Sequence, residues 1–106
     1  MERDKITLYI PDDLLIKLTE KAAEFETSVN SLASYSLKKY FERENIKFTP
    51  DEVEKVKNIQ AGRLDTKTTI RVSQNVKKSI DEISQSYNIA KNSLILYVIK
   101  NDEGGR

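Results

Sequence analysis

Two short stretches of the sequence alternate polar and apolar side chains, and their polar members either donate hydrogen bonds or carry positive charge. One stretch is KITLYI at residues 5–10, and the other is KTTIRV at residues 67–72. A row of lysine, arginine, threonine and tyrosine is suited to binding through hydrogen bonds and charge. The candidate binding residues are the polar members of both stretches: Lys5, Thr7, Tyr9, Lys67, Thr69 and Arg71.

The composition leaves little room for catalysis. The chain has neither cysteine nor histidine, which excludes thiolate and imidazole metal sites, disulfides, and Ser-His or Cys-His nucleophile pairs. Two adjacent acid pairs, Asp12-Asp13 and Asp51-Glu52, remain as candidates for a metal or acid-base site. Both pairs fall where a helix is expected to begin and where negative charge stabilises the helix dipole. We therefore predict no catalytic residue, no metal and no cofactor.

The charge is unevenly distributed along the 106 residues. The formal net charge is +1, but residues 67–106 contain seven basic and four acidic residues. A basic region of this kind is typical of nucleic-acid-binding proteins. No apolar run approaches the roughly 18 residues that span a bilayer, and the opening MERDKITLYI does not look like an export signal. We expect a cytoplasmic protein without a membrane partner.

The sequence repeats itself at an offset of 62 residues. The stretch VNSLASYSLKK at 29–39 returns as KNSLILYVIKN at 91–101. Extended without a gap, the alignment has eight identities in the 34 positions 5–38, where chance would produce about two. The identical pairs are Lys5 with Lys67, Thr7 with Thr69, Glu20 with Glu82, Asn30 with Asn92, Ser31 with Ser93, Leu32 with Leu94, Tyr35 with Tyr97 and Lys38 with Lys100. We infer two copies of one structural unit.

Each copy predicts a strand followed by two helices. The alternating stretch predicts a short strand with one buried face, after which the period changes to that of an amphipathic helix. The apolar residues of this first helix are Leu14, Leu18, Ala22 and Phe25 in copy one, and Val76, Ile80, Ile83 and Tyr87 in copy two. A break separates it from the second helix in each copy, and Asn88 is suited to a left-handed turn there.

Caps and core residues follow from the same alignment. Ser73 is the expected cap of the first helix in copy two, and Ser28 caps the second helix of copy one, whereas copy two has Ala90 at that place. On the second helices we expect Leu32 and Leu94 in the core and Tyr35 and Tyr97 in packing contacts. The final DEGGR reads as a frayed tail.

The segment between the copies predicts a connector helix near residues 50–61. A capping box of Thr49 and Glu52, with Pro50 in the first turn, marks its start, and Gly62 marks its end. A thin apolar stripe predicts that this helix packs against one of the copies.

A unit of this size, with TLYIP ending the strand and SVNS at residues 28–31 opening the second helix, resembles the ribbon-helix-helix family of Arc- and MetJ-like DNA-binding proteins. The resemblance covers residues 6–41 almost throughout. It implies a mainly α fold with a short two-stranded antiparallel β-ribbon. The tandem repeat would form an intramolecular pseudo-dimer, with residues 1–46 as the first unit, 47–66 as the connector and 67–106 as the second unit.

Pairing of the two strands within one chain has a defined register. It would place Thr7 opposite Thr69, Tyr9 opposite Lys67 and Lys5 opposite Arg71. A ribbon with two different halves predicts an asymmetric DNA site. The alternative is an intertwined homodimer, in which like copies pair across two chains.

The resemblance also implies the roles of particular residues. In the family, the outward side chains of the ribbon read base edges in the major groove, which assigns that role to the six polar strand residues. The start of the second helix holds DNA phosphates through backbone N–H groups. By position, the phosphate-binding residues are Ser28, Val29, Asn30, Ala90, Lys91 and Asn92.

Three classes of function remain open. The first is a sequence-specific double-stranded DNA-binding protein, either a transcriptional repressor or an accessory protein of plasmid transfer in a relaxosome, whose copies could associate side by side on DNA. Some conjugation accessory proteins carry two such units in one chain. The second is an antitoxin, which would need a long toxin-binding extension, whereas about six residues follow the expected last helix. The third is a dimerisation module that does not bind DNA.

Overall fold

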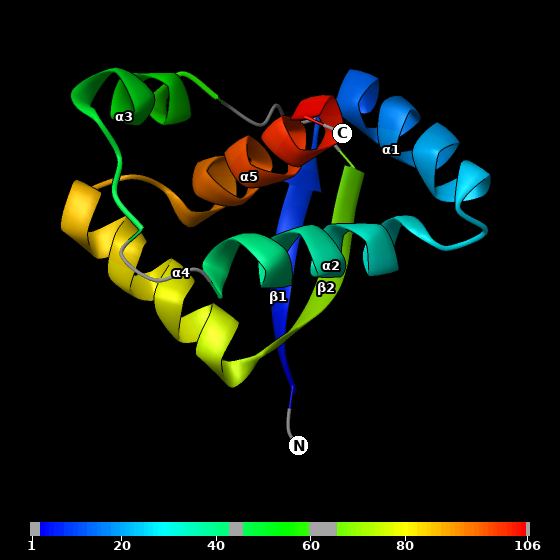
Figure 1. The fold of residues 1–106 in the computed structure, drawn as a ribbon, viewed down its shortest axis with the longest axis horizontal. Coiled ribbons are helices and arrows are strands. Elements are labelled where there is room, and N and C mark those ends of the chain that lie inside the picture. Colours follow the sequence, from blue (N-terminus) through cyan, green and yellow to red (C-terminus); the bar gives the residue numbers. More distant parts are fainter. Residues whose placement is uncertain (1–2, 43–45, 60–65, 106) are drawn as a thin grey trace.

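The computed structural model describes residues 3–42, 46–59 and 66–105. In this part of the chain there are two strands and five helices (Figure 1). In chain order they are β1 Arg3–Ile10, α1 Asp12–Glu24, α2 Val29–Phe41, α3 Pro50–Lys57, β2 Thr66–Ser73, α4 Gln74–Tyr87 and α5 Lys91–Gly105. The order strand, helix, helix therefore occurs twice. We call β1, α1 and α2 the first segment, and β2, α4 and α5 the second segment.

The two strands form one antiparallel sheet, so the fold is mainly helical with a two-stranded ribbon. Thr7 lies opposite Thr69 at its centre. Lys5 pairs with Arg71 and Tyr9 with Lys67, which is the register predicted from the sequence. Because each segment has a single strand, the backbone groups of β1 find their ladder partners only in β2.

The core lies on one face of this ribbon. Leu8 and Ile10 of β1 and Ile70 of β2 are fully buried, and Val72 is nearly so. Figure 1 shows α2 and α5 crossing the same face of the ribbon, while α1 and α4 lie towards opposite sides of the molecule. The alternating pattern of each strand thus places its apolar phase under the helices and its polar phase on the other face.

Both segments make the same turn between their helices. Glu26 and Asn88, which are 62 positions apart, have left-handed backbone conformations with φ of 54° and 55°. In the first turn the Thr27 N–H donates to Ala22 O, and in the second the Ile89 N–H donates to Ser84 O. The prediction of a left-handed turn at Asn88 is confirmed. The first segment makes the same turn at Glu26, although glutamate tolerates a positive φ less well than asparagine does.

The helix starts also follow the sequence. The hydroxyl oxygen of Ser28 accepts from the Ser31 N–H, and that of Ser73 accepts from the Val76 N–H. These bonds satisfy N–H groups that have no partner inside the helix. Asp12 and Asp13 lie in the first turn of α1, as expected of a helix start.

The predicted start of the connector helix is confirmed, but its predicted end is wrong. Thr49 and Glu52 form the expected capping box, with Pro50 in the first turn. The helix ends at Lys57 rather than near residue 61, because the chain leaves it to pack Ile59 against the second segment. Gly62, the expected terminator, lies outside the described residues. Val56 is fully buried, and α3 packs against α5.

Three other predictions from the sequence are wrong. Phe25 and Tyr35 were expected to pack, but they are 62% and 60% exposed. Phe25 is the C-cap residue of α1, beyond its last turn, and no described element covers the outer end of α1 and α2. The expected frayed tail is also wrong, since α5 continues to Gly105.

The left-handed turn of the first segment predicts a stabilising substitution. Glu26→Asn should raise the free energy of unfolding by roughly 0.5–1 kcal/mol, because asparagine tolerates φ near +55° better than glutamate does. Urea denaturation at neutral pH measures the change. The reciprocal variant Asn88→Glu is the control and should lose a similar amount. A Glu26→Asn variant no more stable than the parent would contradict the turn as described.

Candidate nucleic-acid interface

The six polar strand residues singled out from the sequence share one face of the ribbon. All six side chains are exposed: Lys5, Thr7, Tyr9, Lys67, Thr69 and Arg71. The intervening Leu8 and Ile70 are fully buried on the opposite face. The strands therefore present six adjacent polar side chains to solvent in three cross-strand pairs.

This face is positively charged. Lys5 and Arg71 lie directly opposite each other in the register, and Lys67 is at the other end of the ribbon. Like charges in direct opposition destabilise a strand pair. The outward positions from Lys5 to Tyr9 and from Lys67 to Arg71 include three basic residues and no acid. The face therefore favours anions at both ends of the ribbon.

The starts of α2 and α5 are bonded to the ribbon. The Asn92 side chain, at the start of α5, accepts from the Tyr9 N–H at 2.8 Å and donates to the Tyr9 carbonyl at 3.2 Å. On the other strand, the Ser34 hydroxyl of α2 donates to the Arg71 carbonyl at 2.9 Å. Tyr9 and Arg71 are again 62 positions apart. The second helix of each segment thus binds the outer edge of the other segment's strand.

Asn30 lies at the corresponding place in α2 and takes part in a related contact. Its side-chain oxygen accepts from the Thr68 hydroxyl at 2.9 Å. The resemblance assigned Asn30 and Asn92 to phosphate binding. In the structure both side chains bind the ribbon, a role that depends on contacts between the two segments.

A groove of about 660 Å³, lined by both polar and apolar side chains, runs beside β2, between α2 and the start of α4. It brings Asn30 together with Thr69 and Arg71. Sequence reasoning missed Ser34 and Lys38, which also line it. The signal was present, since residues 30, 34 and 38 recur every four positions and so share one helix face.

The remaining phosphate candidates differ between the segments. Ser28 uses its hydroxyl as the cap of α2, and Val29 and Asn30 supply first-turn N–H groups. Ala90, which precedes α5, has no side-chain oxygen that could cap the helix or contact a phosphate. Lys91 forms an ion pair with Asp81 of α4, with Nζ and Oδ1 2.8 Å apart. The positive charge at the start of α5 is therefore shared with a carboxylate that the sequence did not single out.

Among the described residues, no group of three or more acidic side chains could hold a metal ion. None of the helices in residues 3–42, 46–59 and 66–105 has the length and apolarity needed to cross a membrane.

Comparisons with protein-family models, with curated proteins and with solved structures gave no match to this chain. The ribbon and the helix starts bound to it are therefore the features of the molecule that bear on its function.

The ion pair between Lys91 and Asp81 predicts a pH-dependent contribution to stability. The hydrogen bond from Lys91 holds the pKa of Asp81 below its ordinary value of 3.8, and the charges of Lys91 and Lys77 act in the same direction. A lowered pKa in the folded state stabilises the protein above the unfolded-state value, and this contribution is lost as the pH falls through the folded-state value.

Asp81→Asn should therefore lower the free energy of unfolding at pH 7, by less than about 1 kcal/mol because the side chains of Lys91 and Asp81 are 56% and 38% exposed. The difference from the parent should shrink as the pH falls from about 5 through the lowered folded-state pKa of Asp81, where Asp81 becomes protonated first in the unfolded and then in the folded state. Urea denaturation over this range tests it. Glu82→Gln removes the same charge from the next position of α4, and an equal, equally pH-dependent loss in that control would show that the pair is not responsible.

Proposed function

We propose that the protein binds double-stranded DNA sequence-specifically by inserting the β1–β2 ribbon into the major groove. In this proposal the chain is a tandem ribbon-helix-helix protein, whose two units pair with each other as an intramolecular pseudo-dimer. The observation that carries the proposal is the exposed face of six polar side chains on an antiparallel ribbon whose other face is buried.

The dimensions and chemistry of this face suit the major groove. A two-stranded ribbon fits that groove, where each base pair presents a distinct pattern of donors and acceptors. Arg71 can form two parallel hydrogen bonds with guanine, and Lys5 beside it can donate to the same kind of acceptor. Thr7 and Thr69 at the centre can bond a base edge or contact a thymine methyl group.

The edges of the ribbon support the same proposal. Since the side chains of Asn92 and Asn30 bind the ribbon, the starts of α5 and α2 are held beside it. A helix start presents free N–H groups and the positive end of the dipole, both of which favour phosphate. Two such starts flanking a ribbon in the groove would meet the two DNA backbones, which would position the ribbon.

The two halves of the ribbon differ, and the proposal therefore includes an asymmetric site. Tyr9 and Arg71 occupy equivalent places in the two strands, but one offers a hydroxyl and the other a guanidinium group. A transcriptional repressor and an accessory protein of plasmid transfer both require such recognition, and they are the two biological roles that we propose.

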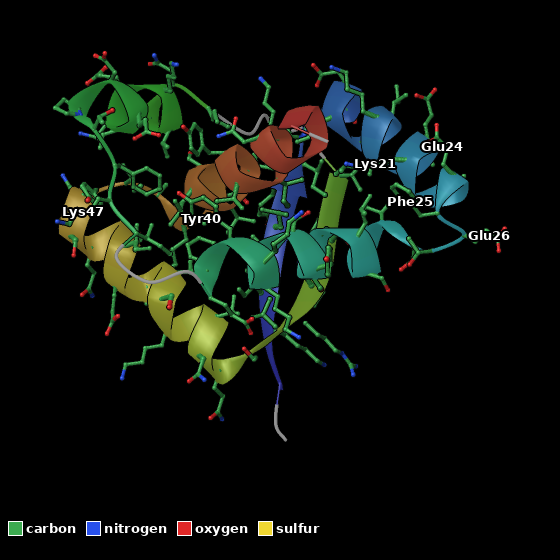
Figure 2. All side chains as sticks on the ribbon, in the orientation of Figure 1. Lys21, Glu24, Phe25, Glu26, Tyr40 and Lys47 are labelled. Atoms are coloured by element: carbon green, nitrogen blue, oxygen red, sulfur yellow. The ribbon has the colours of Figure 1, made fainter. Side chains whose placement is uncertain are left out.

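Replacing the arginine of the ribbon tests base reading. Arg71→Ala should weaken binding to a selected DNA site by about 1–3 kcal/mol, while weak nonspecific binding persists. A gel-shift titration at fixed salt, with selected and scrambled duplexes, measures both. Lys47→Ala is the control, since Figure 2 shows Lys47 at the left margin of the molecule, away from the two strands. Equal affinity of parent and Arg71→Ala for the selected site would remove Arg71 from the readout.

Pairing within one chain predicts the particle mass. Free protein at micromolar concentration should scatter light as a particle of 12.2 kDa, because the ladder of each strand is completed inside the chain. A stable particle of twice that mass, unchanged on dilution, would support the intertwined homodimer instead. The measurement needs DNA-free protein, since copies on adjacent sites could associate.

A further inference from the structure

A groove of about 430 Å³ lies at the outer end of the first segment, between α1 and α2. Its walls include Phe25 and Tyr35, which are 62% and 60% exposed, together with Ser31 and Leu32. Exposed aromatic side chains around a hollow are typical of a surface that binds another molecule.

The second segment has the corresponding face, but there the connector covers it. The ring of Phe48 packs edge-on against Tyr87 and Tyr97, with centroid distances of 5.3 and 5.9 Å. The Phe48 N–H also donates to the Tyr87 hydroxyl at 3.0 Å. Phe48 is only 7% exposed as a result.

Two further hydrogen bonds hold the connector helix on this face. The Ser93 hydroxyl donates to the Ile59 carbonyl at 2.6 Å, just beyond the end of α3. The Tyr97 hydroxyl donates to the Glu52 carboxylate at 3.5 Å, in the first turn of α3. An aromatic side chain and a short helix with an acidic start therefore fill this site.

The residues that hold the connector have counterparts in the open groove. Ser31 and Ser93 are each the third residue of their helix, and Tyr35 and Tyr97 are each the seventh. Phe25 caps the end of α1 where Tyr87 ends α4. The open groove thus repeats the connector site without its occupant. This match between the two segments rests on the tandem architecture in the proposed function, but it does not require that the protein bind DNA.

The two faces differ in charge. Lys21 and Lys39 line the open groove, whereas Ile83 and Asn101 stand at the equivalent positions of the second segment. Lys39 Nζ lies 5.3 Å from the centre of the Tyr35 ring. Figure 2 shows Lys21 and Phe25 directed towards α2, while the acidic side chains of Glu24 and Glu26 point outwards. An occupant of the open groove is therefore expected to be more acidic than the connector.

We propose that this groove is the docking site for a segment of a partner protein, made of an aromatic residue followed by a short amphipathic helix with an acidic first turn. The aromatic ring would take the place between Phe25 and Tyr35 that Phe48 takes between Tyr87 and Tyr97. The acidic turn would lie near Lys39, and the apolar side of the helix would cover Leu32. This is the helix-in-groove mode of recognition, with an aromatic anchor.

A peptide of residues 46–59 is the probe, because it carries the chemistry that fills the equivalent site. Titrated into the isotope-labelled full-length protein, it should shift the NMR signals of Phe25, Ser31 and Tyr35, with a dissociation constant below about 1 mM. The same peptide with Phe48→Ala should bind at least about tenfold more weakly. Tyr35→Ser in the protein should have a similar effect.

Ile16→Ser is the matched control in the protein, because Ile16 is as exposed as Tyr35, at 60%, but does not line the groove. It should bind the peptide like the parent, and Ile16→Ser should also retain the parent's affinity for DNA. Absence of shifts at millimolar peptide would overturn the proposal, as would shifts confined to Tyr87 and Tyr97. Concentration-dependent dimerisation of the chain alone, abolished by Tyr35→Ser, would also overturn it by making a second copy the occupant.

Discussion

The hydrogen bonding between β1 and β2 is the constraint on which the rest of this fold depends. Each segment has one strand, and a single strand leaves its backbone donors and acceptors without partners. Pairing joins parts of the chain that are more than 50 residues apart and places Leu8 and Ile70, both fully buried, over one core. It also leaves two open edges, which polar side chains from α2 and α5 bind. The same contacts that complete the ribbon hold the two helix starts beside it.

The connector makes the two segments unequal. A single chain has only one connector, and it covers the aromatic face of α4 and α5 while the matching face of α1 and α2 stays open. Tyr97 is consequently half-buried where Tyr35 is exposed. An assembly of two identical chains has no such difference between its halves. The outer ends of the two segments therefore present different surfaces, one covered by the connector and one open.

Much of the fold and the candidate site could be predicted from local patterns. Period-two alternation identified the strands and their exposed residues, and the capping box at Thr49 located the start of α3. The register predicted for pairing within one chain, with Thr7 opposite Thr69, is the observed one. The contacts of Asn92 and Lys91 could not be predicted in the same way. These contacts join side chains from different helices and strands. The periodicity of the sequence does not show which helix or strand packs beside a given side chain.

The sequence by itself determined which residues form strands and helices and which face of each strand is polar, since these follow from side-chain spacing and backbone preferences within a few residues. Only the tertiary structure decided the burial of aromatic residues at equivalent positions. Tyr35 and Tyr97 are each the seventh residue of their helix, yet Tyr35 is exposed and Tyr97 packs against Phe48. The burial of a surface side chain depends on which other part of the chain packs on it, and the connector covers this face in the second segment and leaves it open to water in the first.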